Sequence, residues 1–324
     1  ASDSKLWDIR REKIDAVTSE FSVEQKKILE QYTPKMKDIF LGIQHMLAEI
    51  LDLEKRTEVG KIGLELFSGS IVSEVPLWKK RLNGGKSDVE PLLLIAHILQ
   101  ESINDAAIWD VGQLMSEWLD SIFQSMETIQ AFKSRINLLS ECSSKGLETR
   151  PRITIVNDTA GIILAKIYPK VAEVGGGIYA VSHDATSLYY MDLGMDVRSG
   201  RVKMRFHRIS SILTLILGDA NILPPNVALH SQDRIIVDGL ADYLPDRYFV
   251  RLIEKCLPYL TEGGAIYVSA LLPSSDQVLF SSFFQWHVVR RSRKQFQAIF
   301  DSLNLKSIVF EKDGAIVLQI QKGK

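Results

Sequence analysis

The stretch GLETRPRITIVNDTAG, residues 146–161, decides the fold class. Turn-forming residues lead into ITIV, a short β-branched run that ends in small polar residues, which is how a buried parallel strand enters a loop. Before this stretch, apolar residues recur at spacings of three and four, which indicates helices. One such stripe comprises Ile39, Ile43, Met46, Leu47, Ile50 and Leu51. The sequence therefore predicts a helical domain over residues 1–145 and an α/β domain over residues 146–324.

Six further strands are predicted after ITIV. They cover Gly177–Ser182, Lys203–Arg208, Arg234–Gly239, Ala265–Ala270, Leu305–Lys312 and Ala315–Gln321. Helical intervals between the earlier strands favour a doubly wound parallel sheet with right-handed crossovers. Only two residues separate the last two strands, which predicts a hairpin and one reversed strand. We expect a seven-stranded Rossmann-like sheet with six parallel strands and one antiparallel strand, the layout of the class I methyltransferases.

Composition limits the classes of function. The 324 residues are 46% hydrophobic and 24% charged, as in an ordinary globular protein. Two cysteines, Cys142 and Cys256, do not suffice for a disulfide framework, so we expect a cytoplasmic protein. The best apolar run, Pro91–Leu99, is shorter than the roughly 18 residues of a membrane span. Residues 1–150 carry a net charge of −5 and the remainder +4, too little basic excess to indicate nucleic-acid binding.

Two glycine-rich strings resemble phosphate-binding motifs but lack the required context. GGKS at Gly84–Ser87 has no preceding strand, and Lys80 stands where a Walker loop needs its first glycine. GGGIYA at Gly175–Ala180 precedes a predicted strand instead of following one, so we interpret it as a turn.

The loop after the first strand is the predicted cofactor position. Ligands of open α/β sheets lie beyond the carboxyl ends of the strands, where backbone N–H groups and a helix dipole are available. Asn157, Asp158, Thr159 and Gly161 would line this position. An alternative stays open, in which Asp158 or Thr159 only caps the following helix.

Several segments together resemble one methyltransferase family. AFKSRINLL (Ala131–Leu139) followed by ITIVNDTAG resembles the beginning of the methyltransferase domain of bacterial proteins of 3-hydroxypalmitic acid methyl ester biosynthesis. RIIVDGLADYLPDRYFVRLI (Arg234–Ile253) is similar to that family's fourth strand and its Gly-Leu-Phe-Asp-Tyr-Leu segment. LTEGGAIYVSALLPSS and FFQWHVVRRSRKQF resemble the fifth strand and a Trp-containing segment that ends in Tyr-Arg-Thr.

The resemblance implies an S-adenosylmethionine site at the carboxyl ends of the strands. Its residues would be Asn157, Asp158, Thr159, Gly161, Ser182, His183, Asp184, Ser210, Asp238 and Gly239. This chain departs from the class I pattern, since Asn157 and Thr159 replace two glycines of the loop. Ser182 replaces the acidic residue that receives the ribose hydroxyls, unless Asp184 substitutes for it.

The resemblance further implies transfer of a methyl group to a carboxylate of a small or acyl substrate. Arg291, at the Tyr-Arg-Thr position, would orient that carboxylate, because a guanidinium fork matches carboxylate geometry. Asp242 and Tyr243 would face the same site, and Phe283, Phe284 and Trp286 could line an acyl pocket. Each has a structural alternative, namely a helix start, a helix cap or core packing.

Two functions stay open. The first is an S-adenosylmethionine-dependent methyltransferase whose helical domain covers the catalytic domain or forms a homodimer. The second is a catalytically inactive relative that uses the sheet for interaction or ligand sensing. We expect no zinc or iron site, because His183, His207 and His287 have no Cys, His or carboxylate partner at a recognisable metal-ligand spacing.

Overall fold

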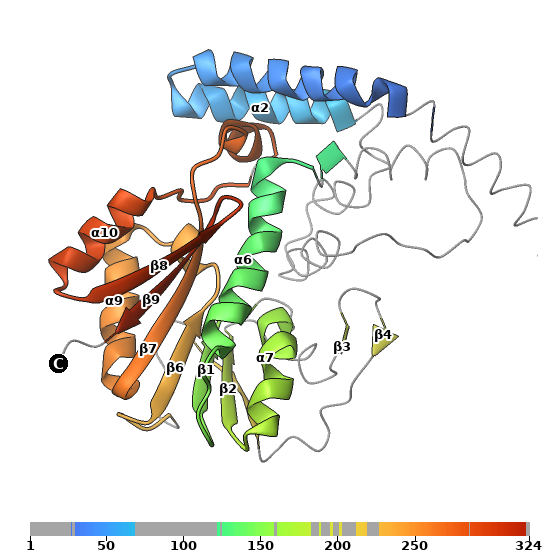
Figure 1. Ribbon diagram of the computed structural model, residues 1–324. Helices are drawn as coiled ribbons and strands as arrows, with labels where there is room; N and C mark the ends of the chain where they lie inside the picture. The colour runs from blue at the N-terminus through green and yellow to red at the C-terminus, as the bar shows by residue number, and fades with distance from the viewer. Residues whose placement is uncertain are drawn as a thin grey trace, which may run out of the picture. The chain divides into compact units, whose positions relative to one another are not determined.

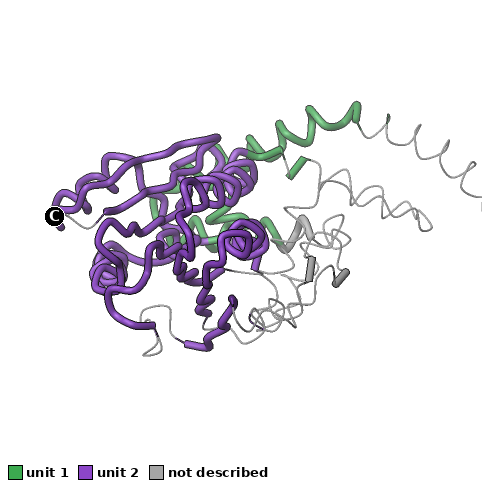
Figure 2. The backbone as a smooth tube through the Cα atoms, turned by 60° about the horizontal axis from the view of Figure 1, so that its bottom comes forward, with its two compact units in different colours: residues 1–85, 101–126, 278–286 green, residues 86–100, 127–277, 287–324 purple. Residues whose placement is uncertain are grey.

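The structure is a computed structural model. It describes residues 27, 30–68, 122–123, 125–158, 161–182, 188, 195–196, 201–202, 212–218, 227–284 and 286–321. The chain forms two compact units (Figure 2). The helical unit comprises Ala1–Gly85, Glu101–Met126 and Val278–Trp286, and the sheet unit comprises Lys86–Gln100, Glu127–Gln277 and His287–Lys324.

The predicted sheet is confirmed. Among the described residues it has seven strands in the order β5-β2-β1-β6-β7-β9-β8. Figure 1 labels all of these strands except β5. These are β5 (Leu213–Leu217), β2 (Gly177–Ser182), β1 (Arg152–Val156), β6 (Gln232–Val237), β7 (Leu260–Leu271), β9 (Ala315–Gln321) and β8 (Lys306–Lys312). The first five are parallel, and β9 runs antiparallel to both neighbours, so that one strand is reversed.

One predicted strand needs correction. The strand next to β2 is β5, Leu213–Leu217, whereas we predicted a strand at Lys203–Arg208, which lies outside the described residues. LTLIL of β5 is a short apolar run that by periodicity alone also fits a buried helical segment. The turn predicted from GGGIYA is confirmed, because Gly175 has φ 69° immediately before β2.

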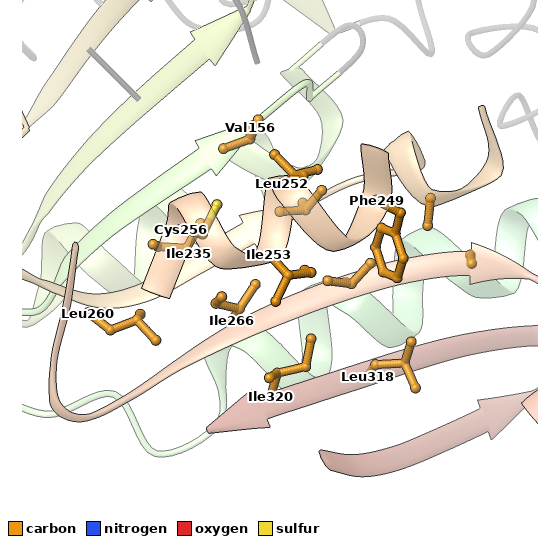
Figure 3. Close-up of a cluster of buried hydrophobic side chains, with 14 of the residues drawn as sticks. Val156, Ile235, Phe249, Leu252, Ile253, Cys256, Leu260, Ile266, Leu318 and Ile320 are labelled. Carbon is orange, nitrogen blue, oxygen red and sulfur yellow. The ribbon is translucent and has the colours of Figure 1, made fainter. Parts of the chain in front are cut away.

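Helices cover the sheet on both faces. α9 (Asp246–Cys256) and α10 (Arg293–Ser302) contribute Phe249, Leu252, Phe296 and Phe300 to a buried cluster with strand residues such as Val156 and Ile235 (Figure 3). Strand side chains alternate between faces, so Ile153 and Ile155, which are buried but absent from this cluster, face the opposite side. There, α6 (Glu127–Ser144) contacts β7 and β9, and α7 (Ile162–Glu173) contacts β2.

Shorter elements complete the sheet unit. These are the 3₁₀ turns η3 (Leu240–Asp242) and η4 (Leu257–Tyr259) and the strands β3 (Met195–Asp196) and β4 (Arg201–Val202), which pair with each other. α6 belongs to the sheet unit by its contacts, although it precedes residue 145, where the sequence predicts the domain boundary.

The helical unit has its own core. It includes helical residues 30–49, α2 (Leu53–Ser68) and the π-helical turn η5 (Leu279–Phe283). A cluster of aromatic rings joins Phe40, Phe123, Phe280, Phe283, Phe284 and Trp286. The three aromatic residues that we considered for an acyl pocket, Phe283, Phe284 and Trp286, are thus packed in this core. GGKS (Gly84–Ser87) lies outside the described residues. In the described part of the chain, no helix has both the length and the apolar character of a membrane span.

Candidate cofactor and acceptor site

The loop after β1 keeps a glycine-like backbone at Asn157. This residue has φ 62°, in the left-handed region of backbone conformation. Among residues other than glycine, Asn and Asp tolerate this region best. The N–H of Asn157 donates to the carbonyl of Val181 at the end of β2 (2.9 Å). Gly161, just before α7, has φ 70°. Asn157 and Gly161 thus both have the left-handed backbone that glycine favours, and Thr159 between them lies outside the described residues.

Asp158 turns its carboxylate towards its own helix. Oδ1 accepts the N–H of Ile163 (3.1 Å) and Oδ2 that of Leu164 (2.7 Å), so the side chain caps the first turn of α7. Asp158 is 1% exposed. Burial, with a smaller contribution from the charge of Asp238, raises its pKa to about 7 against the lowering effect of the helix N–H groups. The capping role that we considered for Asp158 is thus seen directly, and its carboxylate takes up N–H groups that an anionic ligand would otherwise use.

The carboxyl end of β2 is described only at Ser182. This residue is buried, and its carbonyl oxygen accepts the N–H of Gly218 after β5 (2.9 Å). His183, Asp184 and Ser210 lie outside the described residues. Ser210 precedes β5 in the chain, so the residue that follows the carboxyl end of this strand is Gly218 and not Ser210.

The loop after β6 carries the predicted residues Asp238 and Gly239. The N–H of Asp238 donates to the carbonyl of Val156 on the neighbouring strand β1 (3.3 Å). Its carboxylate accepts a hydrogen bond from Ser269 Oγ on β7 (2.8 Å) and lies 3.4 Å from Nε of Arg135. The structure thus brings Asn157, Asp158, Asp238 and Gly239 to the adjacent ends of β1 and β6.

Arg135 also belongs to this site, although no sequence motif indicated it. It comes from α6, is 5% exposed, and donates from Nη1 to Asp242 Oδ2 (2.7 Å). Its guanidinium stacks on the ring of Phe132 at 4.4 Å from the centroid. The available signal was the position of an arginine on the helix face that carries the apolar residues Phe132, Ile136 and Leu139, all of which are buried. A charge on a buried helix face needs a partner.

Asp242 is held from two sides. Oδ1 accepts the N–H of Leu271 at the end of β7 (2.9 Å), and Oδ2 accepts from Arg135. Burial raises the pKa of Asp242 to about 6, against the lowering effect of the Arg135 charge. Tyr243, the next residue, is 54% exposed at the surface of the same loop.

Arg291 is buried against the loop between β6 and α9. Nε donates to Asp246 Oδ1 (2.8 Å), Nη1 donates to the carbonyl of Ala241, and Nη2 donates to the carbonyl of Leu244 (2.5 Å). Asp246 is 71% exposed and presents its carboxylate to the guanidinium fork. The neighbouring Arg290 points elsewhere, to Leu272 O and Thr128 Oγ1 (both 3.0 Å).

The described residues contain no group of three metal-ligating side chains. His287 is exposed, and His183 and His207 lie outside the described residues. The site as described comprises the carboxylates of Asp158, Asp238 and Asp242 with the guanidinium of Arg135 at the ends of β1, β6 and β7, and Arg291 beside the loop after β6.

Comparison with known proteins supports the fold. No protein-family model and no curated protein matches the sequence. A solved structure of a possible exported protein from Bordetella parapertussis is 15% identical, covers 74% of this chain and 84% of its own, and has a TM-score of 0.55. The chain has the class I methyltransferase fold. This follows from the strand order and the reversed strand β9.

Methyltransferases also occur among weaker structural neighbours. An O-methyltransferase family protein from Burkholderia thailandensis is 12% identical, with coverage of 64% of this chain and 62% of its own and a TM-score of 0.43. Human N-acetylserotonin methyltransferase in complex with SAM is 14% identical, with coverage of 63% and 59% and a TM-score of 0.42. Likenesses this distant carry no argument about the activity of this chain.

Proposed function

We propose that this protein is an S-adenosylmethionine-dependent methyltransferase that acts on a carboxylate of a small or acyl substrate. The observation that carries the proposal is the left-handed backbone of Asn157, because glycine, which the class I pattern has at this position, adopts that conformation without strain. The strand order supports it, because ligands of open α/β sheets lie where the connections diverge from a central strand pair, here β1 and β6.

The proposal assigns the residues at this edge to parts of the cofactor. Asn157 and Gly161 would lie along the amino-acid portion of S-adenosylmethionine. Ser182 would accept a hydrogen bond from a ribose hydroxyl. Asp238 and Gly239 would line the side of the site towards β6. When bound there, S-adenosylmethionine supplies an electrophilic methyl group. The work of the protein is then to orient the acceptor and to exclude water, since a carboxylate acceptor needs no strong base.

Arg291 is the proposed cation for the acceptor carboxylate. Its fork now holds the exposed carboxylate of Asp246, which a substrate carboxylate could replace with the same geometry. Arg291→Lys keeps the charge but loses the fork, so we expect a higher KM for 3-hydroxypalmitate and unchanged affinity for the cofactor. Unchanged KM in a methyl-transfer assay would remove Arg291 from the acceptor site.

Calorimetric titration with S-adenosylmethionine and S-adenosylhomocysteine tests the proposal. We expect dissociation constants on the order of 1–100 μM, in the range of typical enzyme substrates. Gly161→Arg should abolish binding, since a side chain at φ 70° is strained and fills the loop. Failure of both ligands to bind at about 1 mM would overturn the proposal.

A second candidate is a non-catalytic interaction or ligand-sensing module. It is favoured by the carboxylate of Asp158, which occupies N–H groups at the start of α7. It is also favoured by the hydrogen bonds that Arg291 donates to the carbonyls of Ala241 and Leu244, because these occupy its guanidinium within the chain. Binding of S-adenosylhomocysteine without methyl transfer to any carboxylate tested would support this candidate. A cytoplasmic location and a homodimer formed through the helical unit are further parts of the proposal.

A further inference from the structure

The edge between β1 and β6 is where the connections of the sheet diverge. From β1 the chain continues through β2 to β5 on one side, while β6 and β7 lie on the other. Val156 at the end of β1 is paired with Val237 at the end of β6, so the residues after these two strands are neighbours. We call Asn157–Asp158 together with residues 238–242 the switch-point edge.

Arg135 fixes one side of the switch-point edge. Its guanidinium bridges Asp238 (Nε to Oδ1, 3.4 Å) and Asp242 (Nη1 to Oδ2, 2.7 Å). Gly239 between them has φ 65°, and a Cβ at this position would lie 3.1 Å from both Nη1 and Nη2 of Arg135. The glycine therefore makes room for the guanidinium as well as for the turn. Among the described residues, Nε of Arg135 is buried without a hydrogen-bond partner and has only the longer contact with Asp238 Oδ1.

The charges at the switch-point edge do not balance. Asp158, Asp238 and Asp242 are all buried there, and Arg135 is the buried cation among the described residues that pairs with two of them. Arg290 also acts on Asp242, but it is shared with Asp276, and Tyr243 lies near both arginines. An excess of buried negative charge stabilises a positively charged ligand relative to a neutral one of the same shape.

We propose that Arg135 is a positioning residue that keeps the carboxylate of Asp242 ionised and the loop of residues 238–242 in place. The switch-point edge thereby favours the positively charged sulfonium of S-adenosylmethionine over the neutral thioether of S-adenosylhomocysteine. The inference rests on the proposed function and goes beyond it, because it names how the same site distinguishes cofactor from product. Arg135 acts through the two carboxylates and touches neither reactant.

The proposal implies a dependence on pH with a defined sign. The pKa of Asp242 is raised to about 6 and that of Asp158 to about 7, so both carboxyls gain charge as the pH rises through this interval. The ratio of the dissociation constants of the thioether and the sulfonium should therefore rise with pH. The α-carboxylate keeps its charge in both ligands over this interval and cancels in this ratio, and the separate titration of each free ligand corrects for its α-amino group.

The experiment is calorimetric titration of the full chain with both ligands from about pH 5.5 to about pH 8.5. For the wild type we expect the ratio to rise about tenfold across this range, with its midpoint between the two pKa values. Arg135→Gln removes the charge that lowers the pKa of Asp242, so the midpoint should move up by about one pH unit. Gly239→Ala displaces the guanidinium and should move the midpoint in the same direction.

Arg234→Gln is the matched control. Arg234, on β6, also joins this strand to α6, because it donates to the carbonyls of Ser143, Lys145 and Gly146 at the end of that helix. It does so at the opposite, amino-terminal edge of the sheet, where β6 begins. Its loss should lower stability and leave the midpoint unchanged, which separates a structural effect from an effect on the ligand charge.

The outcomes are distinct. A wild-type ratio that does not vary with pH, or a midpoint that Arg135→Gln and Gly239→Ala leave in place, would overturn this inference while the proposed function stands. Failure of both ligands to bind would overturn the proposed function and this inference together. If Arg135→Gln does not fold, Gly239→Ala and the wild-type curve still decide the matter.

Discussion

Asn157 illustrates how a single residue can depart from a motif and keep its geometry. A left-handed conformation costs roughly 1–2 kcal/mol for most residues, much less for Asn and nothing for Gly. We therefore expect Asn157→Val to lower the free energy of unfolding by about 1–2 kcal/mol, because a β-branched side chain is least tolerated at φ 62°. Urea denaturation would measure the change.

Asn157→Gly is the matched control for this prediction. Glycine adopts the left-handed conformation without strain, so we expect a change within about 0.5 kcal/mol of the wild type. Equal stability of the Val and Gly variants would show that residue 157 is not held in this conformation.

The sequence predicted which residues lie at the candidate site better than it predicted the side chains with which they pair. The small polar residues after ITIV indicated the loop, and the structure places Asn157, Asp158, Asp238 and Gly239 at adjacent strand ends as expected. The partners of these residues could not be predicted, because Arg135 on α6 reaches Asp238 and Asp242 across more than a hundred residues of sequence. Side-chain pairing of this kind depends on tertiary packing that no local pattern encodes.

At the scale of elements, α2 packs closely against η5 through Gly60. A Cβ at Gly60 would overlap the backbone carbonyl of Ser282 in η5, which is rigid main chain. Gly60→Ala should therefore lower stability by about 1–3 kcal/mol, the cost of overpacking, although Ala is the better helix former. The loss should appear in thermal unfolding followed by circular dichroism.

Gly42→Ala provides the control within the same unit. Gly42 also lies in a helical segment, but nothing lies within 4 Å of a Cβ placed there. We expect this variant to be neutral or up to about 1 kcal/mol more stable, from helix propensity alone. A stabilising effect of both substitutions would contradict the close packing of α2 on η5.

The start of α6 is capped by residues far away in the sequence. Asp276 Oδ2 accepts the N–H of Thr128 (3.0 Å), Oδ1 accepts from Thr128 Oγ1 (2.6 Å), and Ser275 donates to Glu127. Asp276→Asn should cost about 0.5–2 kcal/mol, the range for loss of a helix cap. Asp301→Asn, at an exposed position on α10, should change the urea midpoint little. Equal losses in both variants would argue against this cap.

Elements with a clear pattern were predictable, and those without one were not. The strands at Gly177–Ser182 and Ala315–Gln321 have the predicted bounds, because each is a β-branched run between turn residues. β5 was missed, because LTLIL has no alternation and its place at the edge next to β2 depends on pairing with Ile178 and Val181. The position of an edge strand is set by its pairing in the sheet and not by its own sequence pattern.

At the scale of the whole molecule, buried carboxyl groups link stability to pH. Asp242 and Asp158 have pKa values of about 6 and about 7 in the folded chain, above the value of 3.8 for a free side chain. Between about pH 4 and about pH 7 the folded state thus holds protons that the unfolded state has released. Their contribution to stability is complete below about pH 4 and is lost as the pH rises to about 7.

We therefore expect the free energy of unfolding of the wild type to fall from about pH 5 to about pH 7, by about 1 kcal/mol per pH unit for each such group. Asp158→Asn should remove the contribution of Asp158 to this pH dependence, because Asn does not titrate. Its side chain keeps one oxygen that can accept a hydrogen bond from an N–H group of α7. Glu254→Gln on the exposed face of α9 should leave the slope as it is. Urea midpoints measured at several pH values would give the slopes, and identical slopes for wild type and Asp158→Asn would show that Asp158 is ionised throughout. That result would also remove Asp158 from the pH dependence of ligand discrimination, because a carboxylate already charged at pH 5 cannot gain charge by pH 7.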